Sequence, residues 1–217
     1  MNPPPHPMVP ALMAEHAEWL RGTAPGPTSL AIPIRLALAH AHFEAIHPFA
    51  EGNGRIGRML LSLMLAEEGH VPVPLSRVLE ADRARYYDAL RAAQQQLDFV
   101  PLALLMCEAI QVSAEAAHDL DRRLCELPVL WKDPARWPNR RLPRRDGVAS
   151  RLLDLLPYHP MITVGLVEQR FGVSRQAANE GVRALDAAGI LVERTGYRRN
   201  RVFVARDALA AIVGSEI

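Results

Sequence analysis

The chain has 217 residues, of which 49% are hydrophobic and 6% aromatic. This length accommodates one large domain or two small ones, and an aliphatic, alanine-rich composition favours helices, because Ala and Leu are good helix formers. The net charge of +1 excludes a strongly basic or acidic chain, yet residues 1–134 carry a net charge of −5 and residues 135–217 a net charge of +6. We therefore expect two parts of different kinds.

Cys107 and Cys125 are the two cysteines of the chain, which is too few for a disulfide framework and indicates a reducing compartment. The first residues show no basic segment followed by an apolar one, so no signal peptide is predicted. No apolar run in the sequence approaches the ~20 residues that are needed to span a membrane, so no membrane-spanning helix is predicted. We expect a cytoplasmic protein without a membrane partner. The proline-rich start suggests a trimmed or naturally short form of a longer protein.

Residues 1–10 contain five prolines and are expected to form an extended arm. Apolar periodicity predicts helices at 10–21, 30–46, 59–68, 76–96 and 99–124. The segment 30–46 is apolar on nearly every side, which indicates a buried central helix. Within it, His40 and Glu44 are four residues apart and are interpreted as a hydrogen-bonded pair, with metal ligation as the lesser alternative.

The segment from His47 to Arg58 reads HPFAEGNGRIGR and separates two predicted helices. Its glycines suit a tight turn that opens a helix, whose free N–H groups attract anions. Arg55 and Arg58 lie three residues apart and can bind phosphate. Glu51 would repel a phosphate unless a divalent cation such as Mg²⁺ lies between them. Histidine is a common general base, so His47 completes a site for chemistry on a nucleotide phosphate.

This segment resembles the core motif of the Fic (Fic/Doc, Fido) family, H-x-F-x-(D/E)-G-N-G-R-x-x-R, with every fixed position filled. The resemblance covers roughly residues 9–125, and it implies transfer of AMP from ATP to a Ser, Thr or Tyr hydroxyl of a target protein. It implies that His47 is the base, that Glu51 holds magnesium and that Phe49 is a hydrophobic anchor. The residues implied to bind the nucleotide or its phosphates are Gly52, Asn53, Gly54, Arg55, Arg58 and Tyr87, with Gln94 near a polar position.

Other readings of the motif stay open. Relatives are known that phosphorylate, uridylylate or transfer phosphocholine, and a degenerate site could bind nucleotide without transferring it. Inhibited relatives carry a Ser/Thr-x-x-x-Glu-Gly/Asn string whose glutamate pairs with the second motif arginine, here Arg58. No such string occurs in residues 1–217, so Arg58 is expected to be free.

After the predicted helix at 99–124 the composition changes. Residues 127–149 combine prolines and arginines and read as a linker. Short helices at 150–156, 163–171 and 174–188, with Ser174 as an N-cap, precede two strands at 190–194 and 201–205. This order resembles a winged helix-turn-helix domain.

The sequence therefore predicts a mainly α protein, a Fic-type helical bundle followed by a small winged helix-turn-helix domain. The expected divisions are 1–10 (arm), 11–126 (Fic domain), 127–149 (linker) and 150–217 (winged helix). A DNA-binding regulator, with the Fic domain as a nucleotide-binding or other transferring module, is the alternative function; a protein-binding winged helix and oligomerisation also stay open. The candidate DNA contacts are Arg175, Gln176, Asn179, Arg183, Arg198 and Arg199, with Arg201 also in the wing.

Overall fold

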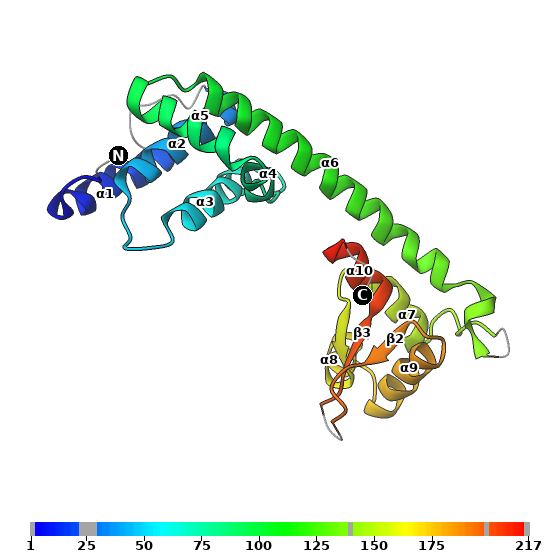
Figure 1. The fold of residues 1–217 in the computed structure, drawn as a ribbon. Helices are drawn as coiled ribbons and strands as arrows, with labels where there is room; N and C mark the ends of the chain where they lie inside the picture. Colours follow the sequence, from blue (N-terminus) through cyan, green and yellow to red (C-terminus); the bar gives the residue numbers. More distant parts are fainter. Residues whose placement is uncertain (1–2, 22–29, 139–140, 198–199, 215–217) are drawn as a thin grey trace. The chain divides into compact units, whose positions relative to one another are not determined.

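The computed structural model describes residues 3–21, 30–138, 141–197 and 200–214 (Figure 1). They are mainly helical, with one small sheet. The chain divides into two compact units, Met1–Ala117 (unit 1) and His118–Ile217 (unit 2), and the division falls within helix α6 (Val100–Trp131). Each unit has its own hydrophobic core.

All the secondary-structure elements in the described part of unit 1 are helices. A 3₁₀ turn, η1 (His6–Met8), precedes α1, and Pro10 lies in the first turn of α1, where its missing N–H costs no hydrogen bond. The helices that follow are α1 (Val9–Leu20), α2 (Ile32–Ile46), α3 (Asn53–Glu67), α4 (Ser76–Ala81), α5 (Arg83–Gln96) and the first part of α6.

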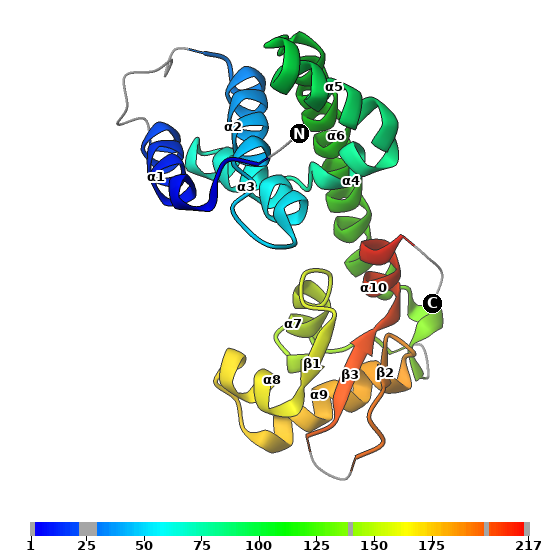
Figure 2. The ribbon, with the colours of Figure 1, turned by 60° about the vertical axis from the view of Figure 1, so that its left-hand side comes forward.

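Helix α2 is the centre of unit 1, because α1, α3 and α5 all contact it (Figure 2). Its small and aliphatic residues, among them Leu36, Ala37 and Ala41, are buried in the core of unit 1. Residues of α3, α5 and α6 complete this core, including Leu61 of α3 and Leu102 of α6. The prediction of a buried central helix is confirmed. This arrangement fixes the end of α2, and therefore the residues after it, against α3 and α5.

Helix α6 is, by length and composition alone, long and apolar enough to cross a membrane, which the sequence analysis did not expect. Core helices of soluble proteins pass the same test. Leu102, Leu105 and Met106 belong to the core of unit 1, whereas Leu127 and Trp131 belong to the core of unit 2. The two ends of α6 therefore pack in different cores, while 28% of its apolar window is buried.

Unit 2 contains the end of α6, a 3₁₀ turn and a helical layer on a three-stranded sheet. In chain order the elements are η2 (Pro134–Arg136), α7 (Val148–Leu155), β1 (Met161–Thr163), α8 (Val164–Phe171), α9 (Arg175–Ala187), β2 (Leu191–Glu193), β3 (Val202–Ala205) and α10 (Arg206–Val213). The strand order is β1-β3-β2, and both pairings are antiparallel. Val204 of β3 lies opposite Met161 of β1 and Val192 of β2.

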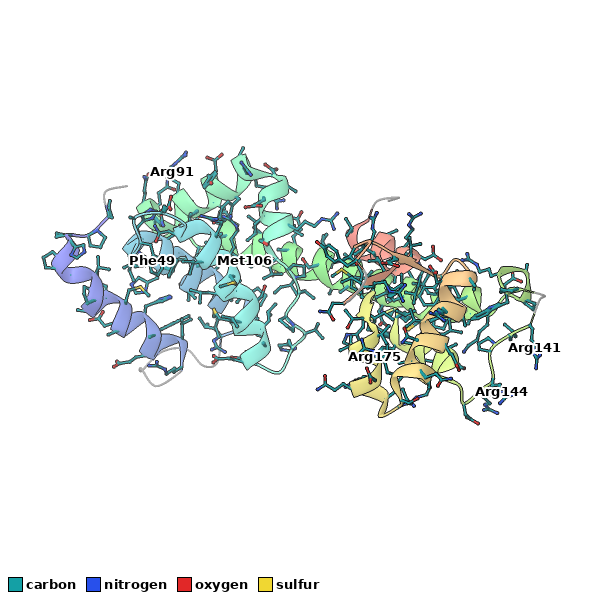
Figure 3. The ribbon with its side chains drawn as sticks, turned by 90° about the horizontal axis from the view of Figure 1, so that it is seen from below. Phe49, Arg91, Met106, Arg141, Arg144 and Arg175 are labelled. Carbon is teal, nitrogen blue, oxygen red and sulfur yellow. The ribbon has the colours of Figure 1, made fainter. Side chains whose placement is uncertain are left out.

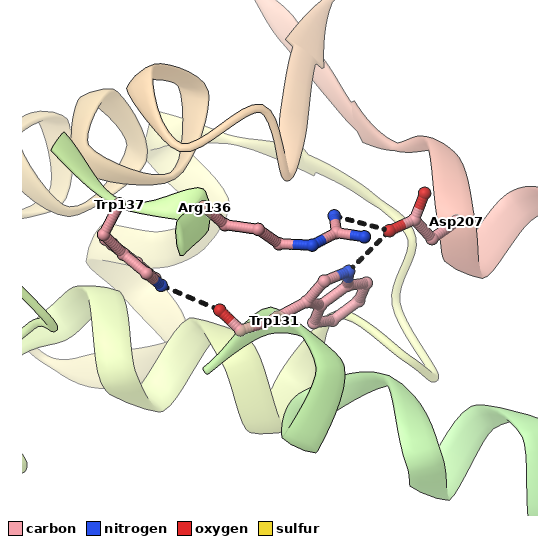
Figure 4. Close-up of polar contacts among 4 residues, drawn as sticks. All are labelled: Trp131, Arg136, Trp137 and Asp207. Atoms are coloured by element: carbon pink, nitrogen blue, oxygen red, sulfur yellow. Dashed lines mark hydrogen bonds and ion pairs between the residues drawn. The ribbon is translucent and has the colours of Figure 1, made fainter. Parts of the chain in front are cut away.

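The end of α6 is fastened to the rest of unit 2 by tryptophans (Figure 4). Trp131 is fully buried, and its Nε1 donates to Asp207 Oδ2 of α10 at 2.8 Å. Arg136 also donates to that oxygen, at 3.3 Å, and Trp137 Nε1 donates to the Trp131 carbonyl at 2.8 Å. The ring burial and the satisfied N–H groups hold the segment 131–137 against α10.

Several expectations need correction. The segment 1–10 is not an extended arm, since η1 and the start of α1 lie in it. The helix expected at 76–96 is two helices, divided at Asp82, which caps α5 by accepting from Arg85 N–H. The helix expected to end near 124 continues to Trp131, so 127–131 is helix and not linker, and Trp137 is also a core residue. Strand β1 and helix α10 had not been predicted.

Candidate active site around residues 47–58

The connection between α2 and α3 is built on two residues in the left-handed region. His47 is the C-cap of α2, with φ of 51°, and its N–H donates to the Phe43 carbonyl. Gly52 is the N-cap of α3, with φ of 83°. Glycine adopts this conformation without strain, which explains its place before the helix. The prediction of a tight loop opening a helix is confirmed.

Asn53 holds the loop in shape. Its buried side-chain amide accepts from the Phe49 N–H at 2.9 Å and donates to the Phe49 carbonyl at 2.7 Å. Both backbone groups of Phe49 are thereby satisfied, while Phe49 is 46% exposed and its ring centroid lies 6.5 Å from that of Phe43. Asn53 therefore organises the loop, and the hydrophobic side chain of Phe49 is partly exposed.

The backbone of α3 approaches α2 closely at Gly57. A Cβ atom at this position would lie 2.6 Å from Glu44 Oε1, 3.0 Å from Phe43 Cδ1 and 3.1 Å from His40 Cε1. A distance under 3.0 Å means that the end of the Glu44 side chain would have to move if residue 57 carried a Cβ atom, so glycine permits the close approach of the two helices. The side chains that face Gly57 are largely polar, which is unusual at a helix crossing.

The expected pair of His40 and Glu44 does not form. His40 Nε2 instead lies 2.6 Å from the Tyr86 hydroxyl of α5, and Glu44 Oε1 is buried without a hydrogen-bond partner among the described residues. Burial lowers the pKa of His40 to about 4 and raises the pKa of Tyr86. Burial also raises the pKa of Glu44, while the charges of His47 and Arg58 act in the opposite direction.

The sequence analysis expected Arg58 to be free, but the structure pairs it with another side chain. Its Nη2 forms an ion pair with Glu80 Oε1 of α4, and its side chain is 11% exposed against 43% for Glu80. The Arg58 Nε is buried and has no partner among the described residues. Any phosphate that uses this guanidinium must therefore compete with Glu80. The sequence offered no signal for this pair, because the two residues are 22 positions apart on different helices.

A cavity of about 390 Å³ lies beside His47 and is lined by Pro3, Glu44, Ala45, His47, Leu90 and Gln94. Gln94, named in the sequence analysis, is fixed by donating to the Ala41 carbonyl at 3.2 Å. Tyr87 is not among the lining residues; it is 53% exposed and its ring lies 5.1 Å from that of Tyr86. Glu44, Ala45 and Leu90 were not predicted as site residues.

The other predicted residues lie at the start of α3. Gly52 and Gly54 are half-buried there, and Arg55 and Glu51 are exposed. Among the described residues no group of three His, Cys, Asp or Glu side chains could hold a metal. Glu51 supplies a single accessible carboxylate, which suits Mg²⁺ where phosphate oxygens complete the coordination.

In unit 2 the predicted contacts lie on α9 and near a second cavity. Arg175, Gln176 and Arg183 are exposed, Asn179 is half-buried, and Asn179 Nδ2 donates to the Arg175 carbonyl. The cavity, of about 290 Å³, is lined by Thr163, Val164, Gly165, Arg175, Asn179, Asn200 and Arg201. Arg198 and Arg199 lie outside the described residues.

Comparisons with known proteins agree with this geometry for unit 1. Residues 1–65, which include the whole segment 47–58, match the model of the Fic/DOC family. A probable protein adenylyltransferase of Aquifex aeolicus is 37% identical over 94 residues, 43% of this chain and 27% of the relative. A Fido domain-containing protein of Dictyostelium discoideum is 44% identical over 72 residues, 32% of this chain and 47% of the relative. Residues 1–65 of unit 1 are therefore similar to the domain of the Fic/DOC family.

The structural match to a solved Fic family protein of Desulfovibrio desulfuricans covers 94% of this chain and 56% of that protein, with 21% sequence identity and a TM-score of 0.47. The matched region spans only about a quarter of the Aquifex protein and half of the Dictyostelium protein. These relatives match less than half of this chain.

Proposed function

We propose that the chain transfers AMP from ATP to a Ser, Thr or Tyr hydroxyl of a protein. The observation that carries the proposal is the position of His47. It follows α2 in a fixed left-handed conformation, beside a cavity, and the residues from Gly52 to Arg55 lie at the N-terminal end of α3. The names of the relatives support the same reaction.

In this proposal His47 takes the proton of the attacking hydroxyl, whose oxygen forms a bond to the α-phosphorus while the bond to pyrophosphate breaks. The N–H groups at the start of α3 would bind the α-phosphate, since a helix N-terminus attracts anions. Asn53 would act through the loop, because both of its hydrogen bonds go to Phe49. The cavity residues that suit contact with the nucleoside are Leu90 and Gln94.

Arg58 would bind the far phosphate. Because Glu80 occupies its guanidinium, ATP binding requires this ion pair to open. Glu51 would hold Mg²⁺ against the phosphates, and the ion would supply charge neutralisation there. An exposed carboxylate at a helix N-terminus fits this role, since it can be reached by a metal–nucleotide complex.

The test is labelling with ATP that carries a tracer on its α-phosphate, in Mg²⁺, with the chain alone and with a cell lysate. His47→Ala should abolish labelling, and any loss of ATP affinity should be small beside this effect, because a base lowers the barrier without holding the ground state. Glu67→Ala, an exposed site at the end of α3, is the matched control. Equal labelling by wild type and His47→Ala would remove His47 from the role of base.

A tracer on the γ-phosphate distinguishes the reactions that the motif leaves open. Label from the α-position alone indicates nucleotidyl transfer, and label from the γ-position indicates phosphorylation. ATP binding without either label would reduce unit 1 to a nucleotide-binding module.

A second candidate function concerns unit 2, which we propose is a winged helix-turn-helix that binds duplex DNA. The supporting observation is the cavity shared by Arg175 and Asn179 of α9 with Asn200 and Arg201 of the segment before β3. Arg175 and Arg183 have no ion pair among the described residues, whereas Arg201 pairs with Glu193 at 3.2 Å. Figure 3 shows Arg175 on α9, with Arg141 and Arg144 on the segment that leads to α7.

Fluorescence anisotropy with a duplex of about 25 base pairs at two salt concentrations tests this candidate. Phosphate contacts make affinity fall steeply with salt, and removing one contact lowers the slope by about 1. Arg175→Ala and Arg183→Ala should each lower affinity, whereas Arg122→Ala, on α6, removes the same charge and should not. Binding that is absent, or equal for all these variants, would favour a protein-binding role for unit 2.

A further inference from the structure

Glu44 is the feature of unit 1 that packing does not explain. It lies one turn before His47 on α2, and its Oε1 is buried against Gly57 with no hydrogen-bond partner among the described residues. A buried polar atom without a partner costs free energy, and native proteins contain few of them. An apolar residue at this position would avoid the cost, so the carboxylate needs a reason to be there.

The charged and titratable groups around Glu44 come from three helices and the loop. Arg58 of α3 is nearby, because a Cβ at Gly54 would lie 3.1 Å from Arg58 Nη1 and 3.9 Å from Glu44 Oε1. Arg58 is nevertheless paired with Glu80. Tyr86 of α5 is bonded to His40, and neither ring donates to Glu44 among the described contacts. His47 lines the same cavity as Glu44, and its charge, like that of Arg58, favours the ionised form of the Glu44 carboxyl and so lowers its pKa.

We infer that Glu44 is a positioning residue for His47, whose carboxylate stabilises the imidazolium formed when His47 accepts a proton. This inference rests on the proposed function only in needing His47 as the base. Such a carboxylate has no partner while the imidazole is neutral, which matches the unsatisfied Oε1. The effect of His47 on Glu44 is the largest of the charge effects that lower the pKa of this carboxyl.

In the reaction, the hydroxyl proton moves to a ring nitrogen of His47 while the oxygen bonds to the α-phosphorus and pyrophosphate departs. The new positive charge forms beside the negative carboxylate in a partly buried site, where opposite charges attract more strongly than in water. The proton then leaves His47 for solvent, and the charge pair disappears. A base held by a third group in this manner is a recurring catalytic arrangement.

The experiment follows the titration of His47 by NMR in the full chain, with the His47→Ala spectrum assigning the signal. In Glu44→Gln AMP transfer should fall by about 10- to 100-fold, a part of what a general base contributes, and its rise with pH should shift to lower pH, because an opposite charge favours the protonated ring. Glu67→Gln removes the same charge from an exposed site and should change neither.

Thermal unfolding separates this role from a structural one. Glu44→Gln should be at least as stable as wild type at pH 7, because Oε1 has no hydrogen bond to lose. Glu44→Asp, which keeps the charge but withdraws it, should give an intermediate midpoint and tests the inference if Glu44→Gln does not fold. A shifted His47 titration without any transfer activity would support the inference while the proposed function fails. An unchanged His47 midpoint in Glu44→Gln would overturn it.

Discussion

Each unit brings two helices together over a glycine, and the groups that meet there differ. In unit 2 a Cβ at Gly181 of α9 would lie 2.5 Å from Val148 Cγ1 and 3.2 Å from the Ala149 backbone nitrogen. In unit 1 a Cβ at Gly57 would meet Glu44, Phe43 and His40. The crossing in unit 2 is apolar and backed by a core, whereas the crossing in unit 1 buries a carboxylate and an imidazole.

The two crossings therefore show two different uses of close helix packing. Buried apolar contacts stabilise a fold, and buried polar groups cost stability unless they are paired. The crossing of α2 and α3 retains two such groups, with Glu44 Oε1 and His40 Nδ1 both lacking partners among the described residues. The crossing of α2 and α3 is therefore expected to serve the site, and the crossing of α7 and α9 to serve stability.

The largest effect that we expect is from Gly181→Ala. The added methyl meets the branched side chain of Val148 and a backbone atom, neither of which can move away freely. Overpacking of this kind costs about 1–3 kcal/mol, and the better helix propensity of alanine offsets up to about 1 kcal/mol of it. Hydrogen exchange measured by mass spectrometry on the full chain should show faster exchange in α7 and α9, with α2 and α3 unchanged. Exchange that is unaltered in unit 2 would mean that this crossing is loose.

Gly57→Ala should destabilise unit 1 less, by no more than about 1 kcal/mol, because alanine is the better helix former and offsets the crowding. The closest atom to the new methyl is the end of the Glu44 side chain, which can rotate. Transfer activity should nevertheless fall, since Glu44 would turn away from His47. A variant with a large loss of stability and full activity would contradict the division between the two crossings.

The smallest effect is the response to mild acid. The pKa of His40 is lowered to about 4, so the folded state resists a proton that the unfolded chain accepts near pH 6.5. The free energy of unfolding that neutral His40 contributes is fully present above pH 6.5 and is lost as the pH falls toward 4. Burial lowers the pKa of His16 and His42 in the same direction, and the raised pKa of Glu44 opposes them.

Between pH 7 and pH 6 we expect unit 1 to lose less than about 1 kcal/mol through His40. The measurement is hydrogen exchange at both pH values, corrected for the intrinsic rate, with α2 and α3 compared to α7 and α9. An equal response in the two units would show that the buried histidines do not set the acid sensitivity of unit 1.

Much of this molecule follows from local sequence. The loop at 47–58 is predictable because glycine, asparagine and the following apolar run are signals within a few residues of one another. The same holds for Ser174, whose Oγ accepts from the Ala177 N–H as an N-cap should, and for the strands near 191–193 and 202–205. The resemblance to the Fic family that this motif predicts agrees with the match of residues 1–65 to the Fic/DOC family model.

Contacts between distant residues could not be predicted in this way. The pairing of Arg58 with Glu80, and of His40 with Tyr86, depends on how α4 and α5 pack on α2 and α3. Trp131 lies in a stretch that reads as a linker by composition. Its buried indole N–H nevertheless donates to Asp207, which is 76 positions away. The roles of the motif residues and of unit 2 stay predictions, since geometry alone does not report a reaction.

The left-handed backbone of His47 also limits which replacements are informative at that position. Glycine and asparagine tolerate this conformation, while alanine loses about 1 kcal/mol or more in it. An inactive His47→Ala protein thus combines two losses, one of a proton acceptor and one of loop geometry. His47→Asn removes the first and keeps the turn at the end of α2, so the comparison of the two variants measures how far the shape of the loop matters apart from its chemistry.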